Sequence, residues 1–290
     1  MGLTIGALVR SILRPTAPLG EPPLNVNCES FGLMIAIISD IHSNTAALTA
    51  VLDDISRRNV ERIICLGDVV GYGPDPCGCI DLIMERCCLT VLGNHDCAVT
   101  YEPSNFNIGA ESACYWTRNA LENSEDPAKR AARWDFLGNL AVKETFDASD
   151  LNLGEIELVH GSPRRPINEY IFPDDIYNNP NKIRGLFDRI GKLCFVGHTH
   201  VPGVFLDTPD FYSPEELEWA FEVDPKRKAI INVGSVGQPR DSDPRAGYAL
   251  VESGGVRFIR VPYDIEDTVK KVQAISELDD YLGARLKKGR

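Results

Sequence analysis

The sequence is short of basic residues and has no long apolar run. Lysine and arginine number 30 against 42 aspartate and glutamate residues, which gives the 290-residue chain a formal net charge of −12. Nucleic-acid binding along the phosphate backbone needs a basic face, so we expect no nucleic-acid track. No stretch reaches the roughly 18 consecutive apolar residues that cross a bilayer, so we also expect no membrane span. Hydrophobic residues still make up 43% of the chain, which is enough for a globular core.

The sequence also lacks cysteine pairs at the spacing of a disulfide framework or a zinc knuckle. Its nine cysteines are an odd number, and one residue instead of two separates Cys77 from Cys79. We therefore expect reduced thiols, buried as small hydrophobic side chains in a cytoplasmic protein.

The N-terminal segment does not have the order of a secretory signal. The mildly apolar stretch 3–9 is followed by Arg10 and Arg14 instead of being preceded by basic residues, and residues 15–23 contain four prolines. Residues 1–33 are interpreted as a loose N-terminal extension or as an over-long start of the chain. The domain is expected to occupy residues 34–290.

Strand and helix patterns alternate at the start of this domain. A short β-branched run at 35–38 predicts a buried strand, and apolar residues spaced at i, i+3, i+4 and i+7 over 45–57 predict an amphipathic helix. Further strands are predicted at 63–66 and 89–92, with a helix at 80–85 between them. This alternation indicates an α/β fold with parallel strands.

The remainder of the chain departs from simple alternation. Residues about 101–140 predict an insertion of two helices that forms either a lid over a site or a part of the core. Strands are predicted at 156–159, 193–196, 229–233, 248–251 and 256–261, the last two as a hairpin. Helices are predicted near 181–189, 265–275 and 277–287.

Potential metal ligands follow five of the predicted strands within about three residues. They include every histidine of the chain: Asp40 and His42, Asp68, Asn94 with His95 and Asp96, His160, and His198 with His200. The carboxyl ends of neighbouring parallel strands meet in one crevice, so these side chains are expected to converge. This mixture of imidazole and oxygen donors indicates a site for manganese, iron or zinc rather than a thiolate cluster. The set is too large for one tetrahedral ion and suits two ions that hold a bridging hydroxide for attack on phosphorus.

These motifs resemble the signature of the calcineurin-like metallophosphoesterase superfamily. The resemblance covers residues 34 to about 262 and rests on five ordered motifs: Asp40-Ile-His42, Gly67-Asp68, Gly93-Asn-His-Asp96, His160 and Gly197-His-Thr-His200. The loops 67–76 and 232–241 further resemble a small bacterial branch related to symmetrical dinucleoside tetraphosphate hydrolases. The resemblance implies a four-layer α/β/β/α sandwich of two mixed sheets flanked by helices.

The resemblance also implies roles for individual residues. It implies two divalent metal ions, manganese or iron with zinc as an alternative, and assigns Asp40, His42 and His200 to one ion, Asn94, His160 and His198 to the other, and Asp68 to both. His95 is implied to be catalytic, because it would stabilise the transferring phosphoryl group or protonate the leaving oxygen. Asp96 is expected to fix the tautomer of His95.

The sequence signals for substrate-binding residues are less specific than those for the metal ligands. Arg240 is preferred as a phosphate clamp because it lies in a glycine-rich loop, ahead of Arg164, Arg165 and Arg245. Tyr72 lies between two glycines and either stacks on a base or packs within its loop.

The sequence therefore predicts a metal-dependent phosphoesterase that hydrolyses phosphate ester or phosphoanhydride bonds. Its expected substrate is a small anionic molecule such as a dinucleoside polyphosphate or another phosphodiester. Serine/threonine protein phosphatase activity on the same core is the alternative, and a non-catalytic scaffold is a further one.

Overall fold

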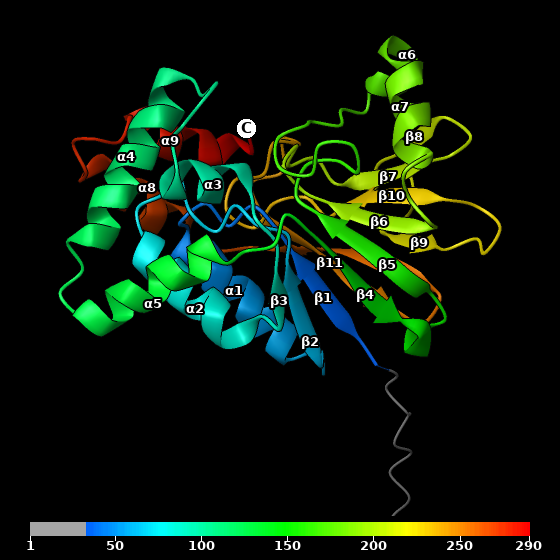
Figure 1. Ribbon diagram of the computed structural model, residues 1–290, viewed down its shortest axis with the longest axis horizontal. Helices are drawn as coiled ribbons and strands as arrows, with labels where there is room; N and C mark the ends of the chain where they lie inside the picture. The colour runs from blue at the N-terminus through cyan, green and yellow to red at the C-terminus, as the bar shows by residue number, and fades with distance from the viewer. Residues whose placement is uncertain (1–32) are drawn as a thin grey trace, which may run out of the picture. The chain divides into compact units, whose positions relative to one another are not determined.

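The computed structural model describes residues 33–290, so the expectations for residues 1–32 lie outside the described residues. Two six-stranded mixed sheets form the centre of this region (Figure 1). The first sheet has the order β3-β2-β1-β11-β12-β9, in which β1, β2 and β3 are parallel. Its strands are β1 (Ile35–Ile38), β2 (Arg62–Cys65), β3 (Leu89–Thr90), β9 (Ala220–Glu222), β11 (Ala246–Glu252) and β12 (Gly255–Val261).

The second sheet has the order β4-β5-β6-β10-β7-β8, in which β5, β6 and β10 are parallel. Its strands are β4 (Lys143–Ala148), β5 (Gly154–Val159), β6 (Leu193–Val196), β7 (Gly203–Leu206), β8 (Asp210–Tyr212) and β10 (Ala229–Asn232). The remaining strands of both sheets pair antiparallel with their neighbours. The second sheet thus has a parallel centre with antiparallel edges, whereas the first sheet is parallel on the side that ends at β3 and antiparallel on the side that ends at β9.

The continuous apolar run of β1 explains why both faces of the first sheet are covered. Successive side chains of a strand point to opposite faces. Ile35 and Ile37 pack in a cluster with Leu158 and Phe195 of the second sheet, whereas the neighbouring residue Ile38 packs in a separate cluster with the helices. Strand runs without polar alternation therefore specify buried strands between two layers.

Helices cover the outer face of each sheet. The first sheet carries helices on its outer side that share a hydrophobic cluster with its strands: α1 (Thr45–Ser56) and α2 (Pro76–Arg86). The outer face of the second sheet packs on α6 (Asp175–Asn178) and α7 (Pro180–Phe187). Figure 1 shows these helices on opposite sides of the paired sheets. The layers are α/β/β/α, which confirms the fold that the resemblance implies.

The block at 101–140 forms α4 (Ile108–Glu122) and α5 (Pro127–Gly138), as predicted. Asp126 caps α5 and is followed by a proline at the first helical position, the arrangement that initiates a helix. The two helices contribute to the core, because they bury Cys114, Leu121 and Leu137 in the hydrophobic cluster that α1 and α2 form with the first sheet.

Several elements have no clear signal in the sequence. Helix α3 (Asn94–Thr100) begins at a predicted ligand, and β4, β7, β8 and β9 were not predicted. β4 alternates exposed and half-buried residues because it is the edge strand of its sheet, and β8 and β9 are only three residues long. Short or edge strands bury too little apolar surface to produce a distinct pattern.

The C-terminal elements complete the described chain. They are α8 (Ile265–Gln273), which confirms the helix predicted near 265–275, and α9 (Asp280–Ala284) followed by the 3-10 helix η2 (Arg285–Lys288), which occupy the place of the helix predicted near 277–287. No helix within residues 33–290 is long and apolar enough to cross a membrane. The eight cysteines of this region are all free thiols.

Candidate metal centre

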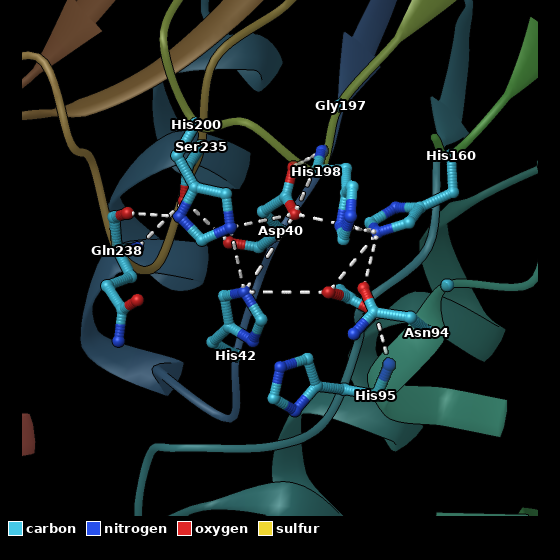
Figure 2. A network of polar contacts seen from close by, with 12 residues as sticks. Asp40, His42, Asn94, His95, His160, Gly197, His198, His200, Ser235 and Gln238 are labelled. Atoms are coloured by element: carbon cyan, nitrogen blue, oxygen red, sulfur yellow. Dashed lines mark hydrogen bonds and ion pairs between the residues drawn. The ribbon is translucent and has the colours of Figure 1, made fainter. Parts of the chain in front are cut away.

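The predicted ligands converge at the carboxyl ends of strands from both sheets (Figure 2). Asp40 and His42 follow β1, and His200 follows β6. The Oδ1 atom of Asp40 lies 3.0 Å from Nε2 of His200, and the Nε2 atoms of His42 and His200 are 3.1 Å apart. These three buried side chains form one group whose potential ligand atoms lie within 4.8 Å of one another.

A second group of ligands lies beside the first. Asp68, His160 and His198 also place one potential ligand atom each within 4.8 Å of the others. Nε2 of His160 is 3.3 Å from Oδ2 of Asp68 and 3.1 Å from Oδ1 of Asn94. The same Asp68 oxygen is 3.7 Å from Nε2 of His42 in the first group, so Asp68 lies between the two groups.

Backbone carbonyl groups fix the orientation of three imidazole rings. Nδ1 of His42 donates to the carbonyl of Val70 over 3.2 Å, and Nδ1 of His160 donates to that of Leu66 over 2.8 Å. His200 donates in the same way to the carbonyl of Gln238. A carbonyl oxygen can only accept, so these contacts place the proton on Nδ1 and leave the lone pair of Nε2 facing the other ligands.

This arrangement requires positive charge at the centre. The lone pairs on Nε2 of His42 and His200 face each other and the Asp40 carboxylate, which is repulsive unless a cation or a proton lies between them. His198 adds its Nδ1 atom 3.2 Å from Nε2 of His160, while its buried Nε2 has no hydrogen-bond partner among the described residues. The donor set therefore fits divalent cations with nitrogen and oxygen ligands.

The buried carboxylates make the centre electrostatically suited to cations. Burial would raise the pKa of Asp40, but His200 and His160 beside it hold that pKa below its ordinary value. Burial likewise opposes ionisation of Asp68, and His160 and His95 keep its pKa low. The pKa of His160 shows the reciprocal effect, since burial lowers it but Asp68 raises it to about 9. Among residues 33–290 the ion-pair partners of these two carboxylates are imidazoles, and backbone N–H groups of His95 and His198 donate further hydrogen bonds to them.

The backbone adopts left-handed conformations at most of these ligands. Positive φ angles, which are uncommon outside glycine, occur at five of them: Asp40 (54°), His42 (48°), Asp68 (51°), His198 (63°) and His200 (60°). Two glycines allow the ligand loops to approach each other closely. A Cβ atom at Gly93 would overlap the backbone of Asp68, and one at Gly197 would lie 2.6 Å from Oδ2 of Asp40. Backbone strain of this kind concentrates at functional sites.

His95 lies next to the ligands in the first turn of α3. Its ring centre is 4.9 Å from that of His42, 4.3 Å from that of Tyr72 and 4.8 Å from that of Phe106. Burial among these rings lowers the pKa of His95 to about 4, although Asp68 opposes the effect. The Sγ atom of Cys114, on α4, is 3.8 Å from Nδ1 of His95.

Asp96 differs from the role expected for it. Its carboxylate accepts hydrogen bonds from the backbone N–H groups of Val70, at 3.2 Å, and Gly93, at 3.1 Å, and thereby caps the start of α3. Each oxygen accepts one of these hydrogen bonds, and the side-chain hydrogen-bond partner of Nδ1 of His95 among residues 33–290 is the thiol of Cys114. The expectation that Asp96 fixes the tautomer of His95 is therefore wrong, because a residue directly after His95 in a helix points to another side.

A cavity of about 390 Å³ opens onto the second group of ligands. Its walls include Asn94, His95 and His198, and the aromatic side chains of Tyr72, Phe106 and Tyr170. Phe106 comes from the loop before α4, so the insertion forms one wall of the cavity as well as part of the core.

The candidate arginines have different surroundings. Arg164 and Arg245 are paired with the carboxylates of Glu169 and Asp243. Arg165 lines the cavity. The guanidinium carbon of Arg240 lies 6.0 Å from the ring centre of Tyr72, and its backbone N–H donates to the carbonyl of the ligand His200 over 3.2 Å.

The sequence did not identify several residues that shape the site. Phe106, Tyr170 and Cys114 belong to loops or to the insertion, where no motif marks them. The ring of Tyr170 stacks on that of His198, with centres 3.9 Å apart and an angle of 19°. The carbonyl groups that orient the imidazoles have no sequence signature, because every residue carries one.

Comparison with known proteins agrees with the geometry. The family model described as the calcineurin-like phosphoesterase superfamily domain matches residues 33–254. An uncharacterized protein of Methanocaldococcus jannaschii is 37% identical over 265 residues, which cover 89% of this chain and 98% of that protein. The crystal structure of a metallophosphoesterase from Sphaerobacter thermophilus is 36% identical with a TM-score of 0.71, and the match covers 89% of this chain and 99% of that one. A hypothetical protein from Pyrococcus horikoshii OT3 shares the fold, at 19% identity and a TM-score of 0.68 over 89% of this chain and 99% of that one.

The chain therefore belongs to the calcineurin-like phosphoesterase superfamily. It is a hydrolase of phosphate esters, and the superfamily is metal-dependent. The buried imidazoles and carboxylates described above supply candidate ligand groups for that dependence.

Proposed function

We propose that the chain hydrolyses a small phosphate ester or phosphoanhydride with two divalent metal ions. The observation that carries this proposal is the pair of adjacent ligand groups with Asp68 between them. Asp40, His42 and His200 would hold one ion, Asn94, His160 and His198 the other, and Asp68 both. Manganese or iron suits this donor set, with zinc as an alternative. Bound ions would supply Lewis acidity, charge neutralisation and a nucleophilic water at neutral pH.

The chain's own residues would position the substrate beside this centre. His95 faces the cavity from the first turn of α3, where its ring could stabilise the transferring phosphoryl group or donate a proton to the leaving oxygen. Arg240 would neutralise phosphate oxygens at the first group of ligands, and Tyr72 would pack against the substrate between Arg240 and His95. The free thiols are consistent with a cytoplasmic location.

The cavity favours a small substrate over a phosphorylated protein. Its volume of about 390 Å³ lies in the range of sites for small molecules, and the aromatic walls suit an organic group attached to the phosphate. A dinucleoside polyphosphate or another small phosphodiester is therefore the preferred substrate. A screen that includes dinucleoside polyphosphates, cyclic nucleotides and phosphopeptides distinguishes this choice from protein phosphatase activity.

The test combines metal analysis with turnover. Purified protein supplied with manganese should bind two ions per chain and hydrolyse bis(p-nitrophenyl) phosphate or p-nitrophenyl phosphate. His95→Ala should lower kcat by about 10²–10⁴ while metal content stays the same. Tyr101→Ala, at the exposed end of α3, is the matched control and should behave like the wild type. Two bound ions without hydrolysis of any substrate in the screen would favour a scaffold, and unchanged turnover in H95A would remove His95 from the mechanism.

A further inference from the structure

His198 differs from the other candidate histidine ligands in how its ring is held. His42, His160 and His200 each donate a hydrogen bond from Nδ1 to a backbone carbonyl. His198 instead directs Nδ1 into the centre, 3.2 Å from Nε2 of His160 (Figure 2). Its Nε2 atom is buried and has no hydrogen-bond partner among residues 33–290. Within this part of the chain, no hydrogen bond from outside the centre fixes the ring of His198.

The ring of Tyr170 covers one face of the His198 imidazole. The two ring centres are 3.9 Å apart and the rings are inclined by 19°, so they are nearly parallel and in contact. Phe172 stacks in turn on Tyr170, with ring centres 5.3 Å apart and an angle of 13°. Offset stacking is a preferred arrangement of aromatic rings. The stack restricts the tilt of the imidazole, because a tilted ring would collide with the face of Tyr170 or lose contact with it.

The segment that carries Tyr170 is attached to the ligand loop. Thr199 is buried and directly follows His198. Its hydroxyl accepts a hydrogen bond from the backbone N–H of Ile171 over 3.3 Å and donates one to the carbonyl of Ile171 over 3.1 Å. Nζ of Lys182 donates to the carbonyl of Tyr170 over 2.7 Å. These hydrogen bonds fix the backbone that places the Tyr170 ring against His198.

We propose that Tyr170 is a positioning residue of the metal centre, whose ring holds the imidazole of His198 so that Nδ1 faces the second ion. This inference rests on the proposed function, in which His198 is a ligand of that ion. Tyr170 then acts on His198 as the backbone carbonyls act on the other three imidazoles, which they orient from outside the centre. Loss of the Tyr170 ring should weaken binding of the second ion and leave binding of the first unchanged.

Manganese binding tests this proposal without turnover. Manganese(II) is titrated into chelator-treated, dialysed protein, and the Kd of each ion is measured by calorimetry. Tyr170→Ala should raise the Kd of one ion about ten- to a hundredfold, the scale observed when outer partners of metal ligands are removed. Tyr170→Phe should bind both ions like the wild type, because the stack requires the ring and not the hydroxyl. Tyr177→Ala is the matched control, since it removes a tyrosine that is 79% exposed on the nearby helix α6.

A double-mutant cycle shows whether Tyr170 acts through His198. In H198A, three candidate ligands of the second ion remain, Asp68, Asn94 and His160, and the weakened binding of that variant is the reference. Adding Y170A to H198A should change the Kd little, whereas a general loosening of the loop would weaken binding by the same factor in both backgrounds. Equal manganese affinity in the wild type and Y170A, or the same factor in both backgrounds, would overturn the proposal. If Y170A does not fold, Tyr170→Leu provides the same comparison without an aromatic ring, and wild-type affinity there would count against the proposal.

Proton NMR of the metal-free protein separates this inference from the proposed function. The chain has five histidines, and the signals missing in H198A identify the ring protons of His198. A stacked tyrosine ring shifts these protons upfield, so the shift should be present in the wild type and Y170F and lost in Y170A. If the wild type shows this pattern but binds fewer than two manganese ions, the proposed function is in question while the positioning of His198 by Tyr170 is supported. His198 signals that are identical in the wild type and Y170A would overturn the proposal.

Discussion

At the scale of single residues, the site depends on atoms that orient the ligands as much as on the ligands themselves. Three imidazoles are fixed by carbonyl groups of two loops: Leu66 and Val70 lie in the loop between β2 and α2, and Gln238 lies in the loop between β10 and β11. Each loop therefore has to be placed correctly before the rings can present Nε2 to a metal ion. The position of His95 also depends on its surroundings, because its ring packs against the rings of His42, Tyr72 and Phe106.

Gly71 tests whether packing positions His95. Its φ is +92°, and a Cβ atom there would overlap the His95 ring, with Cγ at 2.8 Å. Gly71→Ala should displace the ring and lower kcat for bis(p-nitrophenyl) phosphate at least tenfold. Gly154→Ala is the control, because Gly154 has a similar φ of +69° but open space around its Cβ position. Both variants should lose about 1 kcal/mol of stability from the backbone alone, so an equal loss of kcat in both would refute the positioning role of Gly71.

Most of the candidate ligand residues could be predicted from the sequence because they follow recognisable buried strands, whereas Asn94 follows the half-buried two-residue strand β3. The aspartates after 35–38 and 63–66 and the histidines after 156–159 and 193–196 all lie where expected. The surroundings of His95 could not be predicted, since Cys114 is 19 residues away on another helix. Asp96 was misassigned for a related reason: its partners Val70 and Gly93 are backbone groups, which no motif distinguishes.

At the scale of elements, hydrogen bonds between buried side chains and carboxylates join helices to neighbouring strands and helices. Tyr248 of β11 is buried, and its hydroxyl donates to Oδ2 of Asp54 in α1 over 2.8 Å. Arg58 donates to the same oxygen over 2.7 Å. Burial opposes ionisation of Asp54, but the hydrogen bonds from Arg58 and Tyr248 lower its pKa below the ordinary value.

This contact predicts a pH-dependent contribution to stability. Because the pKa of Asp54 is lower in the folded state, the contribution is present above the unfolded value of about 4 and is lost as the pH falls through the folded value. Tyr248→Phe should therefore cost about 1–3 kcal/mol at pH 7 and less at pH 3. Urea unfolding at both pH values measures the difference, with Tyr281→Phe, an exposed tyrosine, as the control. A cost that does not change with pH would show that the hydrogen bond to Asp54 is not its source.

The insertion is attached through a second polar contact. Arg133 of α5 is buried and donates from Nε and Nη2 to the two carboxylate oxygens of Asp81 in α2, each over 2.7 Å. Arg133→Met should reduce the free energy of unfolding by about 1–3 kcal/mol, because Asp81 is partly exposed and regains water. Lys129→Met, at an exposed position of α5, is the control, because it also removes one positive charge from the helix.

Hydrogen exchange gives the result specific to this element. In R133M, amides of α5 should lose protection before those of β1, because the contact holds the insertion and not the sheets. Uniform loss of protection across both elements would mean that the insertion and the core unfold as one unit.

At the scale of the whole described molecule, the sequence revealed the parallel strands of both sheets but only some of the antiparallel ones. Runs such as 35–38 and 193–196 are apolar on both faces, so they are recognisable as strands between two layers. The strands β8 and β9 contain three residues each and are not fully buried, so their place in a sheet depends on neighbours distant in sequence. The pairing of the sheets face to face came from the family resemblance, and the separate clusters on the two faces of β1 now give its physical cause.

Residues of both sheets contribute to the candidate metal centre. Asp40 and Asp68 follow strands of the first sheet, whereas His160, His198 and His200 follow strands of the second. Bound cations would therefore connect the sheets and neutralise buried carboxylates, and any ligand that binds only the folded state stabilises it by mass action. Removing the ions with a chelator should lower Tm, and each ion restored at about a hundredfold above its Kd should return about 2.7 kcal/mol. His198→Ala, which lacks one ligand of the second group, should recover a smaller part of this stabilisation. The measurement is thermal unfolding alongside metal analysis, and an unchanged Tm after verified removal of both ions would show that the centre does not couple the sheets.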